Sequence, residues 1–409
     1  MSRSASPVRR LVHALIPIAF AASLAGCITI PRHPVPAGAT ASAMLPGMPE
    51  VRGWAGSHSD ALERDFILSL QQESPEDFPV GADGVIRYPY LAISGGGANG
   101  AFGAGFLNGW TTTGTRPVFK VVTGVSTGAL MAPFVFLGPR YDPVLHRFYT
   151  TTRSQDVFEA GSPLMALLRR DSLAQTAPLA SLIAQQVDMA LLQEVAEAHR
   201  QGRRLYMGTV DLDSRDFVVW NMGLIAERGD DAALELFRKV MLASSSIPIA
   251  FPPVMFDVEV GGQRYDEMHV DGFVGANVFL NAGVFDPLPL YGRAGRAPGR
   301  EDIFIVHNGQ LHAPPSPTPR SLRGIAARVI ETTGRASIIG DLFREYAFAQ
   351  RNRSGFHWVT IDESVELPDP IAFDTEKMAE LYDIGYRAAA AGPAWLEEPP
   401  GLRPATSPE

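Results

Sequence analysis

Cysteine is almost absent from this sequence, since Cys27 is the only one among 409 residues. A single cysteine excludes an internal disulfide, and no cysteine–histidine cluster has the spacing of a zinc site. The pattern of a calcium-binding loop is missing as well. After residue 27, no apolar run reaches the roughly 18 residues that a membrane-spanning helix requires. The sequence therefore gives no indication of a bound metal or of a spanning segment in the mature chain.

Basic residues are also in short supply. Lysine and arginine number 35 against 44 acidic residues, which gives a formal net charge of −9. Removal of residues 1–26 would take away three arginines and no acidic residue, and the net charge would become −12. An acidic exterior argues against a nucleic-acid partner. Overall charge would also not draw the protein to an anionic membrane.

Residues 1–26 have the features of a secretory signal peptide, with three early arginines, an apolar stretch over 11–22 and small residues before Cys27. The segment LAGC at 24–27 resembles the bacterial lipoprotein box, in which the cysteine becomes the lipidated N-terminus. This resemblance implies a bacterial cell-envelope protein anchored through lipid on Cys27. Ile28 after it favours the outer membrane, facing the periplasm. An ordinary cleaved signal with an incidental cysteine is the alternative.

The rest of the chain divides by composition into three parts. Residues 27–53 are rich in proline, alanine and glycine, which predicts a flexible tether after the lipidated N-terminus. Residues 54–395 are long enough for one large α/β domain, and residues 396–409 are expected to form a disordered tail. Periodicity predicts strands over 88–94, 119–122, 204–211, 216–221, 254–260, 263–270, 303–306 and 356–361, and helices over 60–72, 230–242, 321–352 and 374–391.

Two helical stretches need a closer look. Residues 141–202 are mainly helical, and they either cover an active site as a lid or pack against the sheet. In the helix predicted over 321–352, we expect the apolar side chains to face inward. These are Ile325, Val329, Ile330, Ile338, Ile339, Leu342 and Phe343.

Two glycine-rich loops, each following an apolar strand, stand out between residues 91 and 130. The second is GVSTG at 124–128, a pattern that places Ser126 on a sharp strand-to-helix turn between Gly124 and Gly128. Such a turn exposes the hydroxyl at the positive end of a helix. The first, GGGANG at 95–100, supplies flexible backbone whose N–H groups can bind a developing oxyanion. Together the loops predict an acyl-transfer site.

The first loop also fits the dinucleotide-binding pattern of glycines at 95, 97 and 100. That function requires an acidic residue about 20 positions further on to hold the ribose. Between Gly84 and Tyr141 the chain has no aspartate or glutamate. The missing acid argues against a dinucleotide enzyme.

Four motifs resemble those of the patatin-like phospholipases and occur in that family's order. They are GGGANG at 95–100, GVSTG at 124–128, ASSSIP at 243–248 and DGF at 271–273. The resemblance implies an α/β fold with a central, mostly parallel sheet flanked by helices. It also implies a catalytic dyad of Ser126 and Asp271. The ASSSIP segment would pack behind the nucleophile elbow, which is the sharp turn at 124–128. The implied oxyanion loop comprises Gly95, Gly96, Gly97, Ala98, Asn99 and Gly100.

Two residues depart from the family pattern. Asn99 stands where the family usually has a cation, so any help that a cation gives an anionic headgroup is in doubt. Phe273 stands where the family has glycine or alanine, and we expect it to narrow the pocket beside Asp271.

The resemblance implies hydrolysis of a carboxylic ester in a lipid or other acyl ester, without a cofactor. Asp271 would take the proton of Ser126, and N–H groups around Gly96, Gly97 and Ala98 would hold the oxyanion. Two alternatives stay open. One is a Ser126–Asp271–His307 triad, because His307 follows an apolar strand in the hydrolase order. The other is an envelope lipoprotein that binds lipid without catalysis.

Overall fold

The computed structural model describes residues 31–160, 174–296, 299–312, 315–367 and 369–402. The predicted signal peptide and Cys27 lie outside these ranges. The chain divides into two compact units, Met1–His33 and Pro34–Glu409. The second unit contains the entire described sheet and both apolar cores. Because it has its own core, we expect it to fold by itself.

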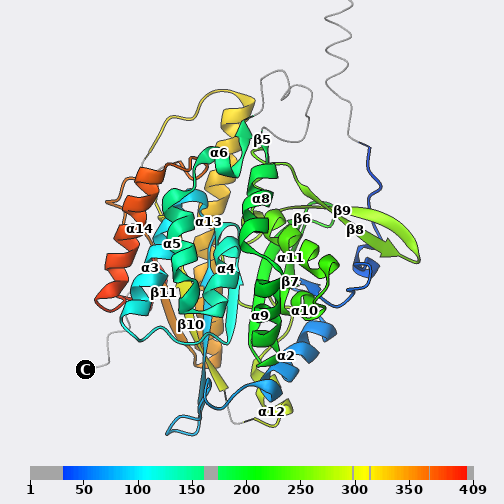
Figure 1. Ribbon diagram of the computed structural model, residues 1–409, viewed down its shortest axis with the longest axis vertical. Coiled ribbons are helices and arrows are strands. Elements are labelled where there is room, and N and C mark those ends of the chain that lie inside the picture. Colours follow the sequence, from blue (N-terminus) through cyan, green and yellow to red (C-terminus); the bar gives the residue numbers. More distant parts are fainter. Residues whose placement is uncertain (1–30, 161–173, 297–298, 313–314, 368, 403–409) are drawn as a thin grey trace, which may run out of the picture. The chain divides into compact units, whose positions relative to one another are not determined.

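A single large sheet organises this unit, as predicted for an α/β protein (Figure 1). Its central strands run parallel in the order β6-β3-β2-β10-β11, and β1, β7, β8 and β9 join by antiparallel pairing. In the described residues its strands are β1 (Arg52–Trp54), β2 (Ile86–Ile93), β3 (Val121–Gly124), β6 (Arg204–Asp211), β7 (Asp216–Asn221), β8 (Val254–Val260), β9 (Gln263–Asp271), β10 (Gly299–Val306) and β11 (Gly355–Val359). A separate short pair joins β4 (Glu159–Ala160) to β5 (Ala174–Gln175).

Helices cover both faces of the sheet. The described α-helices are α2 (Asp60–Gln72), α3 (Gly100–Thr112), α4 (Thr127–Leu137), α5 (Asp142–Thr151), α6 (Ser154–Val157), α8 (Ala177–Gln186), α9 (Met189–Arg200), α10 (Met222–Glu227), α11 (Asp231–Ser244), α12 (Leu288–Arg293), α13 (Leu322–Asn352) and α14 (Thr375–Ala390). The short 3₁₀ helices are η2 (Thr40–Ser42), η3 (Gly97–Asn99), η4 (Pro139–Tyr141) and η5 (Gly272–Val274).

Strand β2 shows how the sequence produces this layering. Successive strand side chains point to opposite faces, and both faces of β2 are apolar. Leu91 and Ile93 join the core under α3, α4 and α14, whereas Tyr88 and Tyr90 join the core under α2, α12 and α13. Parallel strands buried on both sides are expected to be apolar throughout.

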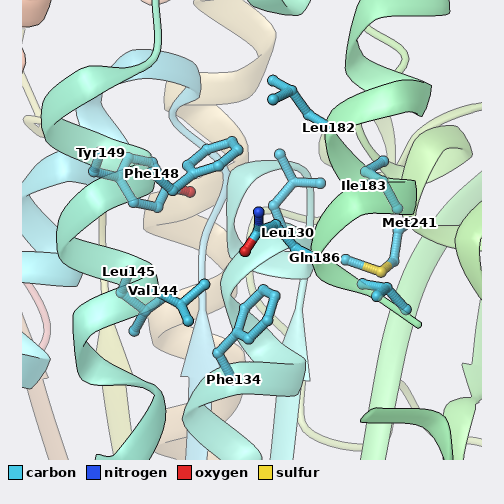
Figure 2. Close-up of a pocket in the computed structure, with 11 residues that line it drawn as sticks. Leu130, Phe134, Val144, Leu145, Phe148, Tyr149, Leu182, Ile183, Gln186 and Met241 are labelled. Atoms are coloured by element: carbon cyan, nitrogen blue, oxygen red, sulfur yellow. The ribbon is translucent and has the colours of Figure 1, made fainter. Parts of the chain in front are cut away.

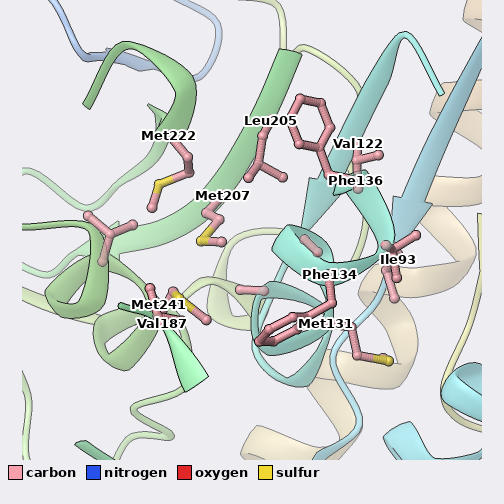
Figure 3. Packing of buried hydrophobic residues seen from close by; sticks show 14 of the residues in the cluster. Ile93, Val122, Met131, Phe134, Phe136, Val187, Leu205, Met207, Met222 and Met241 are labelled. Carbon is pink, nitrogen blue, oxygen red and sulfur yellow. The ribbon is translucent and has the colours of Figure 1, made fainter. Parts of the chain in front are cut away.

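Helix α4, which follows the elbow, lies inside the first core. Figure 3 shows its Met131, Phe134 and Phe136 among the apolar side chains of β2, β3 and β6. A helix that is apolar on all sides is stable only when it is buried. The start of α4 is therefore held firmly in place.

The flexible tether predicted over 27–53 is wrong for residues 34–53. Met44 and Glu259 exchange backbone hydrogen bonds of 3.1 and 2.9 Å, which joins the segment to β8. Four of its side chains, Val35, Ala43, Leu45 and Val51, are buried. Proline and glycine content suggested flexibility, but the interspersed apolar residues add to the core.

The predicted disordered tail over 396–409 is also wrong in its first part. Leu396 and Trp358 of β11 exchange backbone hydrogen bonds of 2.8 and 2.9 Å. The ring of Trp358 donates to the carbonyl of Glu398 at 3.0 Å. These contacts fix the chain beside the edge strand, and residues 403–409 lie outside the described part.

Helix α13 faces the core over only part of its length. Ile338 and Leu342 are buried as predicted. Ile325, Val329 and Phe343, which were also expected to face inward, are 50%, 57% and 39% exposed. The apolar face of the first half of the helix is thus largely exposed in the described residues, so periodicity alone did not show whether that face would be buried.

None of the helices in the described ranges has the length and apolar character needed to cross a membrane.

We predict that Trp395→Ala destabilises the folded unit measurably. The Trp395 ring packs against Phe106, Trp110 and Phe304 with centroid separations of 5.0–5.2 Å. Its partial exposure places the expected loss near the lower end of the range for such truncations, about 3 kcal/mol. Chemical denaturation measures the change, with the exposed Leu402→Ala as control. If Trp395→Ala were as stable as Leu402→Ala, the packing of the Trp395 ring against these three side chains would be contradicted.

Candidate active site

Ser126 occupies a strained turn between β3 and α4. Its φ of 57° and ψ of −125° lie in a region that residues other than glycine rarely adopt. The residue directly precedes the first turn of α4, whose N–H groups carry partial positive charge. The backbone thus presents the hydroxyl at the end of β3, as the GVSTG pattern predicts.

The glycines on either side of Ser126 are required by close packing of backbone. A Cβ on Gly128 would lie 2.2 Å from the carbonyl oxygen of Ile93. A Cβ on Gly124 would lie 2.5 Å from the carbonyl oxygen of Gly128. Real Cβ contacts are essentially never this short, so any side chain would force the turn open.

The serines of ASSSIP support the elbow from behind. The hydroxyl of Ser244 accepts the N–H of Ser126 at 3.0 Å and donates to the carbonyl of Gly208 at 2.6 Å. The hydroxyl of Ser245 donates to the Ser126 carbonyl at 3.3 Å. These bonds tie the turn to α11 and β6, so the motif packs behind the elbow as expected.

The glycine loop after β2 lies directly against the elbow. A Cβ on Gly95 would lie 3.0 Å from Cβ of Ser126. Gly96 and Gly97 have positive φ values of 153° and 56°. Side chains there would meet the carbonyl oxygens of Asn308 at 2.2 Å and of Pro370 at 2.0 Å. Only glycine fits both positions.

The N–H groups of this loop differ in their availability. Ala98, which we expected to bind the oxyanion, donates instead to the carbonyl of Pro370 at 2.8 Å. The N–H of Asn99 donates to the carbonyl of Gly96 at 3.0 Å. The N–H groups of Gly96 and Gly97 have no hydrogen-bond acceptor in the described residues. These two remain as candidate oxyanion donors.

Asp271 ends β9 and is fully buried next to the elbow. Its N–H donates to the carbonyl of Ser246 at 2.9 Å, which links it to the ASSSIP segment. One carboxyl oxygen accepts the N–H of Phe273 at 3.0 Å. The other oxygen, Oδ2, is buried and has no hydrogen-bond partner in the described residues. One side of the carboxyl is therefore held, and the other is free to take a proton.

Burial raises the pKa of Asp271 to about 7, against 3.8 for an ordinary aspartate. The N–H of Phe273 and the hydroxyl of Ser126 lower that pKa in part, which places Ser126 beside the carboxyl. The Ser126 contact does not meet ordinary hydrogen-bond geometry, since Oδ2 has no partner. Catalytic hydrogen bonds are often loose before substrate binds. A carboxylate with a pKa near neutrality is well matched to general-base work.

The histidine considered for a triad is occupied elsewhere. Nδ1 of His307 pairs with the hydroxyl of Thr360 at 2.9 Å. Burial, with the positive charge of Arg335, lowers the pKa of His307 to about 4. His269, on β9, pairs with Thr209 at 2.9 Å. No hydrogen bond joins either histidine to Ser126 or Asp271 in the described residues.

The two departures from the family pattern have different surroundings. Asn99 is buried, and its side-chain oxygen has no partner in the described residues. Phe273 packs against α13, where Gly334 lies beside its ring. It is not among the residues that line the pocket at Ser126. Asp271 is not among those lining residues either, so the expected narrowing of the pocket beside Asp271 stays a prediction.

Ser126 opens into an apolar pocket with about 390 Å³ of space free of atoms, part of it open to solvent. The pocket is lined by Gly97, Ser126, Thr127, Leu130, Phe148, Val157, Leu179, Ser245, Ile247, Phe251, Pro370, Ile371 and Phe373. Phe148 of α5, Val157 of α6 and Leu179 of α8 are among them, so three of the helices within 141–202 line the site.

A second apolar pocket of about 350 Å³ adjoins the first (Figure 2). The two share Leu130 of α4 and Phe148 of α5. Figure 2 shows aliphatic and aromatic side chains of α4, α5 and α8 around it. Its polar lining side chains are few, Gln186 among them. A chain of apolar atoms could extend from Ser126 past Leu130 and Phe148.

Asp211, Glu267 and His269 lie close enough in the described residues to share a metal ion. Each already has a protein partner. Arg52 donates to Glu267 at 3.0 Å, Thr209 pairs with His269, and Asp211 accepts the N–H of Asp213 at 3.0 Å. The Arg52–Glu267 ion pair and the turn closed by Asp211 therefore explain why these side chains lie together.

Sequence reasoning missed Asn308, which positions the glycine loop. Its side chain donates to the carbonyl of Ser94 at 3.0 Å and accepts the N–H of Gly103 at 3.0 Å. Its own N–H donates to the Ser94 hydroxyl at 2.9 Å. The position after an apolar strand was the available signal, but attention fell on the adjacent His307. Nothing in the sequence pointed to Pro370.

Residues 91–283 match the model of a family described as patatin-like phospholipase. The matched segment contains both glycine loops, ASSSIP and Asp271. No curated protein sequence matches the chain.

Solved structures similar to this chain include VipD from Legionella pneumophila and human GIVD cytosolic phospholipase A2. VipD has a TM-score of 0.29 at 11% identity, over 76% of this chain and 70% of VipD. The human enzyme has a TM-score of 0.37 at 10% identity, over 83% of this chain. This chain spans 63% of the human enzyme's length.

We predict that Asp271→Asn alters how stability depends on pH. The native carboxyl has a pKa of about 7 and the unfolded one about 3.8, so the folded state holds an extra proton between these values. The contribution of this carboxyl to the free energy of unfolding is fully present below pH 4. It is lost as the pH rises through about 7. The loss is at most about 4 kcal/mol.

Denaturation at pH 5 and pH 8 measures the effect. Wild type should lose more stability over that interval than Asp271→Asn. Asp257→Asn, which changes an exposed carboxylate on β8, serves as the control and should follow wild type. An identical pH dependence in wild type and Asp271→Asn would contradict the raised pKa.

Proposed function

We propose that this chain, whose residues 91–283 match the model of the patatin-like phospholipase family, is a serine lipid acyl hydrolase. The family match supports hydrolysis of lipid esters in general. The finer proposal is a Ser126–Asp271 dyad that cleaves carboxylic esters through an acyl-enzyme. The supporting observation is the meeting of a strained serine, a buried carboxylate with a pKa near 7 and two unpaired N–H groups.

The reaction begins when Asp271 takes the proton of the Ser126 hydroxyl. The serine oxygen attacks the acyl carbonyl carbon, and the N–H groups of Gly96 and Gly97 bind the resulting oxyanion. Collapse breaks the ester bond, and Asp271 returns its proton to the departing alcohol. Water then attacks the acyl-serine while Asp271 takes a proton from it. Asp271 passes this proton to the departing Ser126 oxygen, which frees the fatty acid and restores the enzyme. Asp271 alternates between its ionised and protonated forms during this cycle. A pKa near neutrality makes both forms accessible.

The two pockets suggest where the acyl chain lies. The first carbons would fill the pocket at Ser126, and the rest would pass between Leu130 and Phe148 into the pocket of Figure 2. Apolar surface lines this path, so longer chains would gain affinity with each buried methylene. We therefore propose long-chain acyl esters as preferred substrates.

The cellular setting belongs to the same proposal. The LAGC segment supports attachment of lipid to Cys27 and a place in the bacterial envelope. Since Pro34 and later residues pack onto the domain, at most a few residues would separate the anchor from the enzyme. Such a short connection would keep the enzyme near the membrane without fixing which of its faces meets the lipid.

Reaction with a fluorophosphonate probe tests the dyad. Wild type should be labelled, and Ser126→Ala should not. Asp271→Asn should react at least about 100-fold more slowly, because it lacks the general base. The rate for wild type should rise with pH, with an apparent pKa of about 7.

His307→Asn separates dyad from triad and serves as the matched control. It should retain most of the wild-type labelling, whereas a triad requires it to lose labelling as fully as Asp271→Asn does. A folded wild type that fails to react with the probe would contradict the dyad and favour the alternative, a lipoprotein that binds lipid without catalysis.

We predict that Leu130→Trp shortens the acyl chains that the enzyme accepts. The larger ring would block the connection between the pockets while leaving Ser126 and Asp271 in place. The ratio of kcat/KM for palmitoyl over butyryl esters should fall at least about tenfold. Leu68→Trp, at an exposed position of α2, is the control. An unchanged ratio in Leu130→Trp would show that the acyl chain does not enter the second pocket.

A further inference from the structure

The first half of α13 carries an exposed apolar stripe. Leu322 is 87% exposed, Ile325 50% and Val329 57%. Spacings of three and four residues place these side chains on one face of the helix. Exposed apolar residues scattered singly are ordinary, but a continuous stripe indicates an interaction surface.

The same segment has the opposite charge to the rest of the protein. Residues 315–340 contain four arginines and one glutamate, a formal charge of +3 in a chain whose net charge is −9. Glu331 pairs with Arg328 at 3.0 Å and with Arg335 at 3.3 Å. Arg320, which precedes the helix, is exposed. An apolar face beside basic residues is typical of helices that lie on anionic membranes.

This helix passes close to the candidate base. The side chain of Asn277 donates to the carbonyl of Gly334 at 2.8 Å. Gly334 also lies against the ring of Phe273, two residues after Asp271. From Gly334 to Leu322 the helix rises roughly 18 Å. Figure 1 shows the gold helix α13 reaching the end of the unit at which α6 lies, and Val157 of α6 lines the Ser126 pocket.

Further exposed apolar residues lie at the pocket itself. Ile371, which is 38% exposed, lines the Ser126 pocket. Ile249, 41% exposed, lies between the lining residues Ile247 and Phe251. The exposed residues at the pocket and those of the α13 stripe come from different chain segments, and both groups are apolar.

We propose that residues 315–336, with the stripe of α13, dock on an anionic phospholipid bilayer and hold the Ser126 pocket against the lipid. The proposal rests on the proposed function for its consequence, which is delivery of an ester from the bilayer to Ser126. The stripe would enter the interface, and Arg320 would contact lipid phosphates. The acidic remainder of the protein would be repelled, so the helix sets the orientation that a terminal anchor leaves open.

Flotation with vesicles tests this surface. The experiment uses the Pro34–Glu409 unit, which has its own core, so that an N-terminal anchor does not contribute. The double variant Leu322→Asp/Val329→Asp is compared with Leu68→Asp/Val80→Asp, which changes exposed apolar residues elsewhere. Vesicles contain phosphatidylcholine alone, or phosphatidylcholine with an equal amount of phosphatidylglycerol.

Wild type and the control variant should bind the mixed vesicles, and salt should weaken that binding. The α13 variant should bind at least about tenfold more weakly. Equal binding of all three proteins would overturn the proposal. So would a wild-type dimer that becomes a monomer in the α13 variant without any change in vesicle binding, because the stripe would then contact a second copy.

Hydrolysis of a soluble butyryl ester separates this proposal from the catalytic one. The α13 variant should hydrolyse it at the wild-type rate, since Leu322 and Val329 do not line the site. Its hydrolysis of esters within mixed vesicles should fall in parallel with binding. Failure of wild type to hydrolyse the soluble ester, with vesicle binding intact, would refute the proposed activity and leave the docking surface supported.

Discussion

The close approach of two glycine loops at neighbouring parallel strands is the constraint on which the site depends. Strands β2 and β3 end at the same edge of the sheet, and the loops that follow them touch. Gly128 packs on the carbonyl of Ile93, and Gly95 packs on Ser126. Because backbone meets backbone here, the serine and the candidate oxyanion donors have a fixed relation. Flexible side chains could not hold that geometry as firmly.

Burial of Asp271 favours its role as a base, but it destabilises the folded state when the carboxyl is ionised. The carboxyl is fully buried, with one oxygen unpaired in the described residues, and its pKa rises to about 7 as a result. A solvated carboxylate would be too weak a base to accept a serine proton efficiently. The same absence of partners makes the ionised form costly in the folded state. The backbone bonds to Ser246 and from Phe273 hold the group in this unfavourable position.

Much of the site could be predicted because its signals are local. Glycine at 95–97, 124 and 128 reports on backbone that no other residue can form, and Asp271 closes a clear hairpin. Predictions failed where partners are distant in sequence. The N–H of Ala98, which we expected to bind the oxyanion, donates instead to the carbonyl of Pro370. Asn308 fixes the glycine loop from the segment after β10, more than 200 residues further along the chain. Such pairings depend on the path of the whole chain.

The sequence by itself determined the strand-turn-helix units, the hairpins and the residue types at the elbow, because backbone conformation and side-chain periodicity are written in short segments. Tertiary structure alone decided which N–H groups stay unpaired, which histidines are occupied and how far burial raises the pKa of Asp271. It also decided that residues 34–53 join the core and that the first half of α13 keeps its apolar face exposed. Periodicity shows that a helix has an apolar face, whereas the surrounding elements determine whether that face is covered.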